Sequence, residues 1–170
     1  MKKYLVIGNP IEHSLSPKLH NYWFEKNNID ANYDRRKIDK SEIQEIINEI
    51  KDNKLDGINV TVPFKTDVIP FLDTLSEEAQ ITQSVNTIYA HDKKLIGHNT
   101  DIKGFELSLK ETHFNLENKT IFILGAGGVV PSIIYALEKL GVSKIIVSNR
   151  TKQKTEKLKK YFSKIRIADW

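Results

Sequence analysis

The sequence predicts an α/β protein of two parts, and three observations predict it. Short apolar runs alternate along the chain with segments whose apolar residues recur at helical spacing. From residue 120 this alternation becomes regular, strand then helix, up to the C-terminus. A glycine-rich turn at 125–128 joins an apolar run to a helical pattern. We therefore expect an N-terminal α/β domain over 1–112 and a second domain over 113–170, half of a doubly wound parallel sheet.

In the first part we expect strands at 4–7, 31–37, 57–62, 85–90 and 95–96. Ser16-Pro17 is a typical helix start, and Asp39 with Glu42 resembles a capping box before a second helix. A third helix is expected over 101–112, whereas 64–82 has no clear pattern.

The second part reads strand 120–124, helix 129–140, strand 144–148, helix 152–163 and strand 165–168. Gly141 is a suitable stop for the first of these helices. This βαβαβ order is one mononucleotide-binding half of a Rossmann-type fold.

Composition excludes several kinds of protein. The chain has 170 residues, 39% of them hydrophobic and 28% charged, which is typical of a globular protein. It has no cysteine, so disulfides, thiolate nucleophiles and cysteine-bound metals are excluded. The five histidines have no metal-ligand spacing, and we expect no metal site. The N-terminal apolar run stops at Asn9-Pro10, too short for a signal peptide or membrane span, so we expect a cytoplasmic protein without a membrane partner.

The net charge of +4 is concentrated near the C-terminus. Residues 143–166 hold nine Lys or Arg against one acid, Glu156, and the rest of the chain is slightly acidic. This distribution favours a local anion site over a nucleic-acid-binding surface, so no nucleic-acid partner is expected. Most of these lysines are simply explained as a solvated helix face.

The segment 59–65 carries one candidate set of site residues. In an extended chain, Asn59 and Thr61 point to one side and Val60 and Val62 to the other, with Lys65 just beyond. Two hydrogen-bonding side chains next to a lysine suit recognition of a polyol or keto acid. From this segment alone, a strand end whose polar side faces water, with Lys65 as an ordinary surface lysine, is the favoured explanation.

Asp101 is the matching acid. It stands where a helix N-cap is expected, and a carboxylate there stays ionised because the helix dipole stabilises it. An ionised Asp101 could orient Lys65 and favour its ammonium form, which predicts an acid–base pair.

Three more polar residues are candidates for substrate binding. Ser14 and Ser16 stand before a predicted helix, where exposed amides and two hydroxyls could surround a carboxylate. For Ser16, plain helix capping is the alternative. Asn86 is either a turn residue or a substrate ligand.

The glycine turn predicts a phosphate site. Gly125 permits the tight turn and Gly127 lets the backbone approach a pyrophosphate at the helix N-terminus. The third position of the glycine pattern is Val130, so we expect a wider separation of helix and strand there. The remaining residues of this predicted site are Ala126, Gly128 and Val129.

The end of the next strand indicates the cofactor. NAD-binding folds place an acid there to hold the ribose diol, and this chain has none. Arg150 instead offers a planar fork for a 2′-phosphate, Asn149 and Thr151 add donors, and Lys154 adds charge. The sequence therefore favours NADP.

Six segments together resemble the shikimate dehydrogenase family, in the family's order: 8–17, 59–65, 84–87, 97–101, 125–128 and 149–151. The resemblance implies reversible NADPH-dependent reduction of 3-dehydroshikimate to shikimate, a step toward chorismate and the aromatic amino acids. By position, Ser14 and Ser16 would bind the substrate carboxylate, and Lys65 with Asp101 would form the catalytic dyad. The ring hydroxyls would be held by Asn59, Thr61, Asn86 and Asp101.

The resemblance also shows a departure, because members of this family are longer and have both halves of the dinucleotide fold. We therefore expect a fragment or truncated form with weak or no turnover by itself. Two alternatives stay open: a non-catalytic module that binds shikimate or nucleotide, and a quinate/shikimate enzyme of relaxed specificity. A monomer or a homodimer is expected, with a small molecule as partner.

Overall fold

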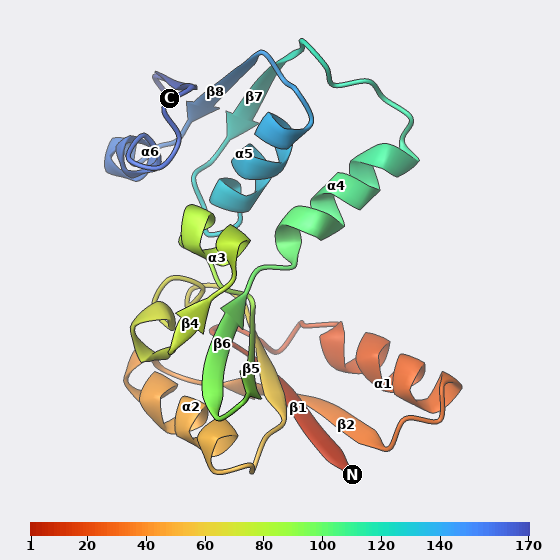
Figure 1. Ribbon diagram of the computed structural model, residues 1–170. Helices are drawn as coiled ribbons and strands as arrows, with labels where there is room; N and C mark the ends of the chain where they lie inside the picture. The colour runs from red at the N-terminus through yellow and green to blue at the C-terminus, as the bar shows by residue number, and fades with distance from the viewer. The chain divides into compact units, whose positions relative to one another are not determined.

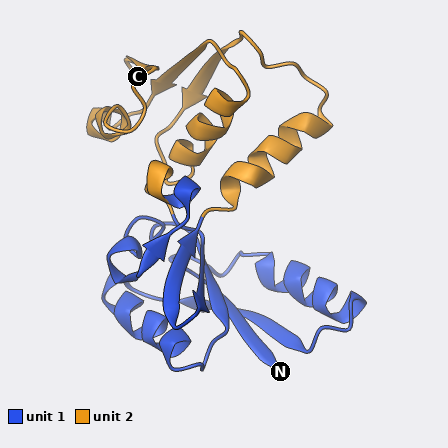
Figure 2. Ribbon diagram, in the orientation of Figure 1, with its two compact units in different colours: residues 1–79, 85–98 blue, residues 80–84, 99–170 orange.

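The computed structural model describes all residues from 1 to 170, in two compact units. The first comprises residues 1–79 and 85–98, and the second residues 80–84 and 99–170 (Figure 2). The division thus follows residue 98, whereas the sequence placed the domain boundary at 113. The reason is that helix α4 (Asp101–Glu111) packs on α5 (Val130–Lys139) and adds Phe105 and Leu109 to the second unit's core. The function assigned to each predicted domain stays a prediction.

The first unit is built on a six-stranded mixed sheet in the order β2-β1-β3-β5-β6-β4. Strand β1 runs parallel to both β2 and β3, while β5 is antiparallel to β3 and to β6 (Figure 1). The strands span Lys2–Gly8 (β1), Ala31–Lys37 (β2), Gly57–Val60 (β3), Thr74–Leu75 (β4), Thr87–His91 (β5) and Lys94–His98 (β6).

Alternation along β1 places helices on the two faces of this sheet. Leu5 and Ile7 belong to the main core, together with the four buried isoleucines of α2 (Ile43–Lys51). Val6 and Tyr4 belong to a smaller cluster that includes Phe24 of α1 (Ser16–Lys26). Since successive side chains of a strand point to opposite faces, α1 and α2 lie on opposite sides of β1 (Figure 1).

The second unit contains a three-stranded parallel sheet in the order β7-β8-β9. Its strands are Thr120–Leu124 (β7), Lys144–Ser148 (β8) and Ile165–Ala168 (β9), and α5 and α6 (Lys152–Leu158) connect them. One core receives side chains from both helices and from β8. The other face of β7 is bare, with Phe122 53% and Leu124 72% exposed.

Most predicted elements are present, and the differences have local causes. The strands predicted at 120–124, 144–148 and 165–168 are confirmed, and so is the Asp39–Glu42 capping box. The stretch 64–82 contains a 3₁₀ turn (Ile69–Phe71), β4 and α3 (Glu77–Thr82), all too short to give a periodic pattern.

Helix α6 ends at Leu158, whereas the sequence predicted a helix to residue 163. The last turn tightens here, because the N–H of Tyr161 donates to the carbonyl of Leu158 three residues earlier. This turn places Phe162 in the core, where only 2% of it is exposed. No helix of the chain is long and apolar enough to cross a membrane.

Candidate active site

The first unit has a cavity of about 300 Å³ that brings together three of the predicted substrate residues. Ser14, Ser16 and Thr61 line it, so two segments that are far apart in the sequence meet at one cavity. The rest of the wall comes from Val6, Pro10, Ile11 and His13. A cavity lined by three hydroxyl-bearing residues together with apolar ones suits a small polar ligand.

Close backbone packing holds Thr61 at this cavity. Its N–H donates to the carbonyl of Ile7 at 2.9 Å, which continues the pairing of β1 and β3. The approach is possible because residue 8 is glycine: a Cβ there would lie 2.6 Å from Cγ2 of Thr61 and 3.0 Å from the carbonyl of Val62. Gly8 is therefore required by space at the site.

A hydrogen bond connects the two serines of this cavity, Ser14 and Ser16. Ser16 is the first residue of α1, but no side chain caps this helix, so the capping role proposed for Ser16 is not what the structure shows. Instead, Oγ of Ser14 accepts a hydrogen bond from the N–H of Ser16 at 3.3 Å.

Asn59 has both ends of its amide engaged within the first unit. Nδ2 donates to the carbonyl of Asn86 at 3.1 Å and to Oγ1 of Thr87 at 3.0 Å. Oδ1 accepts from the hydroxyl of Tyr33 at 2.6 Å. With both N–H groups used, Asn59 can offer a ligand only the remaining lone pair of Oδ1.

Tyr33 is a residue that the sequence analysis did not single out. It is 4% exposed in a strand whose other residues are largely exposed, and its ring stacks on His20 with centroids 4.2 Å apart. Burial raises the pKa of the Tyr33 phenol well above its usual range, and the hydroxyl of Ser16 acts in the opposite direction. A tyrosine among polar residues of a strand is the only sequence signal that could have indicated it.

Lys65 and Asp101, the predicted catalytic pair, belong to different units. Lys65 is buried, with 9% exposed, and its carbonyl accepts from the N–H of Val85 at 2.8 Å. Asp101 is half-buried at the start of α4. Their pairing stays a prediction.

The start of α4 is organised by Asn99, not by Asp101 as a cap. Oδ1 of Asn99 accepts from the N–H of Asp101 at 3.0 Å, and Asn99 is 2% exposed. Its Nδ2 carries two N–H groups, and the two shortest contacts are with the carbonyl of Ser84 and Oγ of Ser132, both at 2.8 Å. Oγ1 of Thr82 lies farther from Nδ2, at 3.2 Å. Asn99 thereby ties 80–84, α4 and α5 together within the second unit.

The glycine turn meets the requirements of a phosphate site. Gly125 has a φ of +107°, and a Cβ at Gly125, Gly127 or Gly128 would have no neighbour within 4 Å. The N–H groups of Gly127 and Gly128 have no backbone acceptor and stand at the N-terminus of α5. Open space and unpaired N–H groups at a helix N-terminus fit a pyrophosphate.

The residues after β8 divide into two roles. Asn149 holds the turn, because its Oδ1 accepts from the N–H of Ala126 at 3.0 Å and its Nδ2 donates to the carbonyl of Thr151 at 2.8 Å. Arg150 and Lys154 are exposed and form no ion pair, so both charges are available to an anion. This arrangement fits a phosphate beside the turn.

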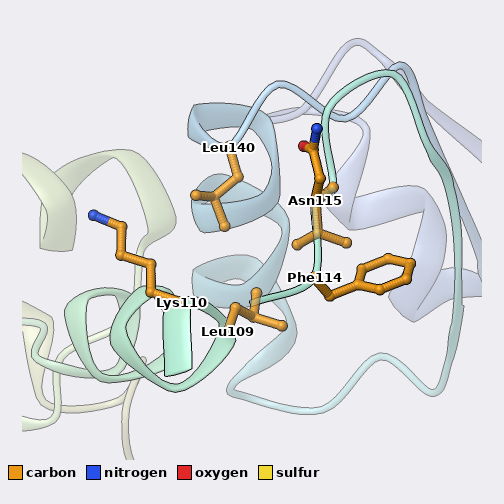
Figure 3. Close-up of a pocket in the computed structure, with 6 residues that line it drawn as sticks. Leu109, Lys110, Phe114, Asn115 and Leu140 are labelled. Atoms are coloured by element: carbon orange, nitrogen blue, oxygen red, sulfur yellow. The ribbon is translucent and has the colours of Figure 1, made fainter. Parts of the chain in front are cut away.

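A second, smaller cavity of about 120 Å³ lies in the second unit near the end of α4. Leu109, Phe114 and Leu140 are among the residues around it (Figure 3). None of the candidate site residues lines it, so we assign it no role.

Two family models match the chain in succession. Residues 6–88 match the shikimate dehydrogenase substrate binding domain, and residues 106–169 match shikimate / quinate 5-dehydrogenase. The chain belongs to the shikimate dehydrogenase family.

Individual members of the shikimate dehydrogenase family are similar over almost the whole chain. The NADP(+) enzyme of Pelagibacter ubique (strain HTCC1062) is 59% identical over 169 residues, which are 99% of this chain and 64% of that protein. The structure of shikimate dehydrogenase from Aquifex aeolicus matches with a TM-score of 0.92 and 39% identity, covering 99% of this chain and 62% of that one.

The shikimate 5-dehydrogenase of Thermus thermophilus in complex with NADP(H) and shikimate has a TM-score of 0.88 and 32% identity. The match covers 99% of this chain and 63% of that one. The chain thus spans less than two thirds of the length of each of these relatives.

Proposed function

We propose that this chain provides the substrate site and the adenosine–phosphate part of the cofactor site of an NADP-dependent shikimate dehydrogenase. The reaction is the reversible reduction of 3-dehydroshikimate to shikimate. Two observations carry the proposal: Ser14, Ser16 and Thr61 line one cavity in the first unit, and the second unit carries an open glycine turn.

In this proposal, different polar residues bind different groups of the substrate. The hydroxyls of Ser14 and Ser16 donate hydrogen bonds to the substrate carboxylate. Thr61, Asn86 and Asp101 hold ring hydroxyls, and Asn59 accepts from a ring hydroxyl because its own N–H groups are engaged.

Lys65 and Asp101 perform the proton chemistry in this proposal. NADPH, when bound, supplies the hydride that reduces the C3 carbonyl. Lys65 as an ammonium stabilises the charge that develops on the carbonyl oxygen and gives it a proton. The Asp101 carboxylate is the group that orients the Lys65 ammonium in this proposal.

The cofactor choice rests on Arg150, which stands where an NAD-binding fold places an acid. Its exposed guanidinium binds the 2′-phosphate, and the N–H groups of Gly127 and Gly128 bind the pyrophosphate.

Calorimetry tests both sites of the 170-residue chain. We expect shikimate to bind more tightly than quinate. Quinate is included because the family model that matches residues 106–169 describes shikimate / quinate 5-dehydrogenase. We expect 2′,5′-ADP to bind about tenfold more tightly than 5′-ADP, since a charge-assisted hydrogen bond contributes about 1.5–3 kcal/mol.

Arg150→Leu should remove the preference for the 2′-phosphate, whereas the matched variant Lys152→Met should keep it. Equal binding of the two nucleotides by the unsubstituted chain would refute the NADP assignment. Binding of shikimate and nucleotide without any NADPH oxidation would favour the alternative of a non-catalytic module.

A further inference from the structure

We propose that Tyr33 is a positioning residue of the substrate site: its hydroxyl holds the amide of Asn59, which through Thr87 sets the orientation of Asn86. The inference rests on the proposed function, since Asn59 and Asn86 are two of the substrate ligands named there. All four residues belong to the first unit.

The direction of each hydrogen bond follows from one acceptor. The backbone carbonyl of Asn86 can only accept, so the atom of Asn59 that contacts it must be Nδ2. Oδ1 of Asn59 therefore faces the Tyr33 hydroxyl 2.6 Å away, and that hydroxyl must donate.

The same logic extends to Asn86. The second N–H of Asn59 donates to Oγ1 of Thr87 at 3.0 Å, which leaves the Thr87 proton to donate elsewhere. Oγ1 of Thr87 lies 3.0 Å from Oδ1 of Asn86 and donates to it. The Thr87 hydroxyl thus connects the two amides, since it accepts from Asn59 and donates to Asn86.

Tyr33 itself is held by two neighbouring residues of α1, His20 and Asn21. Its ring stacks on His20 with an angle of 8° between the planes. Asn21 clamps its backbone, donating to the carbonyl at 2.8 Å and accepting from the N–H at 2.9 Å. A ring fixed in this way holds its hydroxyl at a defined place, and burial keeps the phenol protonated because it raises its pKa.

The first test needs no ligand. In the ¹⁵N-labelled 170-residue chain, Tyr33→Phe should shift the side-chain amide resonances of both Asn59 and Asn86. Tyr4→Phe is the matched control, because Tyr4 is the register partner of Tyr33 on β1 and its hydroxyl has no partner within the protein. This control should shift neither pair of resonances.

Thr87 tests the connection. Thr87→Val should shift the Asn86 amide resonances, and in that background Tyr33→Phe should have no further effect on them. Thr87→Ser keeps the hydroxyl and should restore the original pattern. An Asn86 shift from Tyr33→Phe that persists without the Thr87 hydroxyl would overturn the proposal, as would unchanged Asn59 resonances.

The second test measures shikimate affinity. Tyr33→Phe and Thr87→Val should each weaken binding about five- to tenfold, since a hydrogen bond contributes about 1 kcal/mol, while Tyr4→Phe and Thr87→Ser should not. Binding of 2′,5′-ADP should be unchanged in all four variants, which separates lost positioning from loss of fold. If the unsubstituted chain binds no shikimate and the resonance pattern is as expected, the proposed function fails and the positioning of the amides stands.

Discussion

At the scale of single residues, the site depends on glycine, which has no side chain, at position 8. Gly8 ends β1, and a Cβ at residue 8 would lie 2.6 Å from Cγ2 of Thr61 and 3.0 Å from the carbonyl oxygen of Val62. The cavity wall is therefore set by backbone contact, which a larger residue would push apart.

We predict that Gly8→Ala lowers the unfolding free energy by about 1–3 kcal/mol, the usual effect of an added methyl in a tight site. It should also weaken shikimate binding, because Thr61 must move. Chemical denaturation and calorimetry measure the two effects. Gly104→Ala is the control, since a Cβ there has no neighbour within 4 Å. An unchanged affinity in Gly8→Ala would contradict this account of the cavity.

His20 gives a prediction about pH. Burial lowers the pKa of its imidazole, whose neighbours are the rings of Tyr33 and Phe24. A folded-state pKa below the unfolded value stabilises the fold above the unfolded pKa, and this stabilisation is lost as the pH falls through the folded pKa.

Unfolding free energies measured between about pH 5 and pH 8 should therefore decline toward acid more steeply in the unsubstituted chain than in His20→Phe. The phenylalanine keeps an aromatic ring against Tyr33. Parallel curves for the two proteins would show that His20 does not titrate differently on folding.

At the scale of elements, the packing of α4 on α5 includes a buried charge. Glu106 of α4 is 7% exposed, and its Oε1 lies 3.1 Å from Nζ of Lys139 on α5. Lys103 is a weaker partner, with its Nζ 3.8 Å from Oε2. Removing the closer cation leaves the carboxylate poorly compensated.

We predict that Lys139→Met lowers the unfolding free energy by about 1–2 kcal/mol, less than for a fully buried pair because Lys139 is half exposed. Lys103→Met should change it by less than about 0.5 kcal/mol. The double variant Glu106→Met with Lys139→Met should recover most of the loss, since no unpaired charge remains. Denaturant titrations of the three variants decide the matter, and a double variant as unstable as Lys139→Met would be inconsistent with this reason.

Asn99 connects three elements of the second unit, and we predict a loss of about 2–3 kcal/mol in Asn99→Ala. The substitution leaves the buried hydroxyl of Ser132 and the carbonyl of Ser84 without their donor. Hydrogen exchange should then become faster at the N-terminus of α5, next to the glycine turn. The variant Glu111→Ala serves as control, because Glu111 is an exposed residue at the other end of α4. Equal exchange in Asn99→Ala and the unsubstituted chain would argue against a connecting role.

At the scale of the whole molecule, the two units differ in how completely their sheets are covered. The first sheet has α1 and α2 on its two faces, whereas β7 in the second, which is also an edge strand, has an exposed apolar face. Parallel sheets are normally covered on both faces. Exposed apolar faces and open edges favour self-association.

We predict that Phe122→Thr combined with Leu124→Lys reduces the concentration-dependent light scattering of the 170-residue chain. The matched control is Leu107→Ser, which removes a single exposed apolar side chain of α4, 50% exposed. Scattering that falls equally in both variants would point to a general effect of surface polarity instead of the β7 face.

The sequence by itself determined the parts of this protein that depend on neighbouring residues. The strand, glycine turn and helix around 125–128 are confirmed because the turn and the apolar periodicity are local properties. The proposed preference for NADP rests in the same way on a local feature, the lack of an acid at 149–151. Of the candidate site, the residue types were predictable, since each stands in a short motif.

Only the tertiary structure decided which of these residues meet. The sharing of one cavity by Ser14 and Thr61, and the hydrogen bond from Tyr33 to Asn59, join segments that are far apart along the chain. Such contacts arise from strand order and register, and no single segment of the sequence specifies these. For the same reason the roles of Asn99 and Tyr33 emerged from burial and hydrogen-bond partners, which a sequence pattern does not contain.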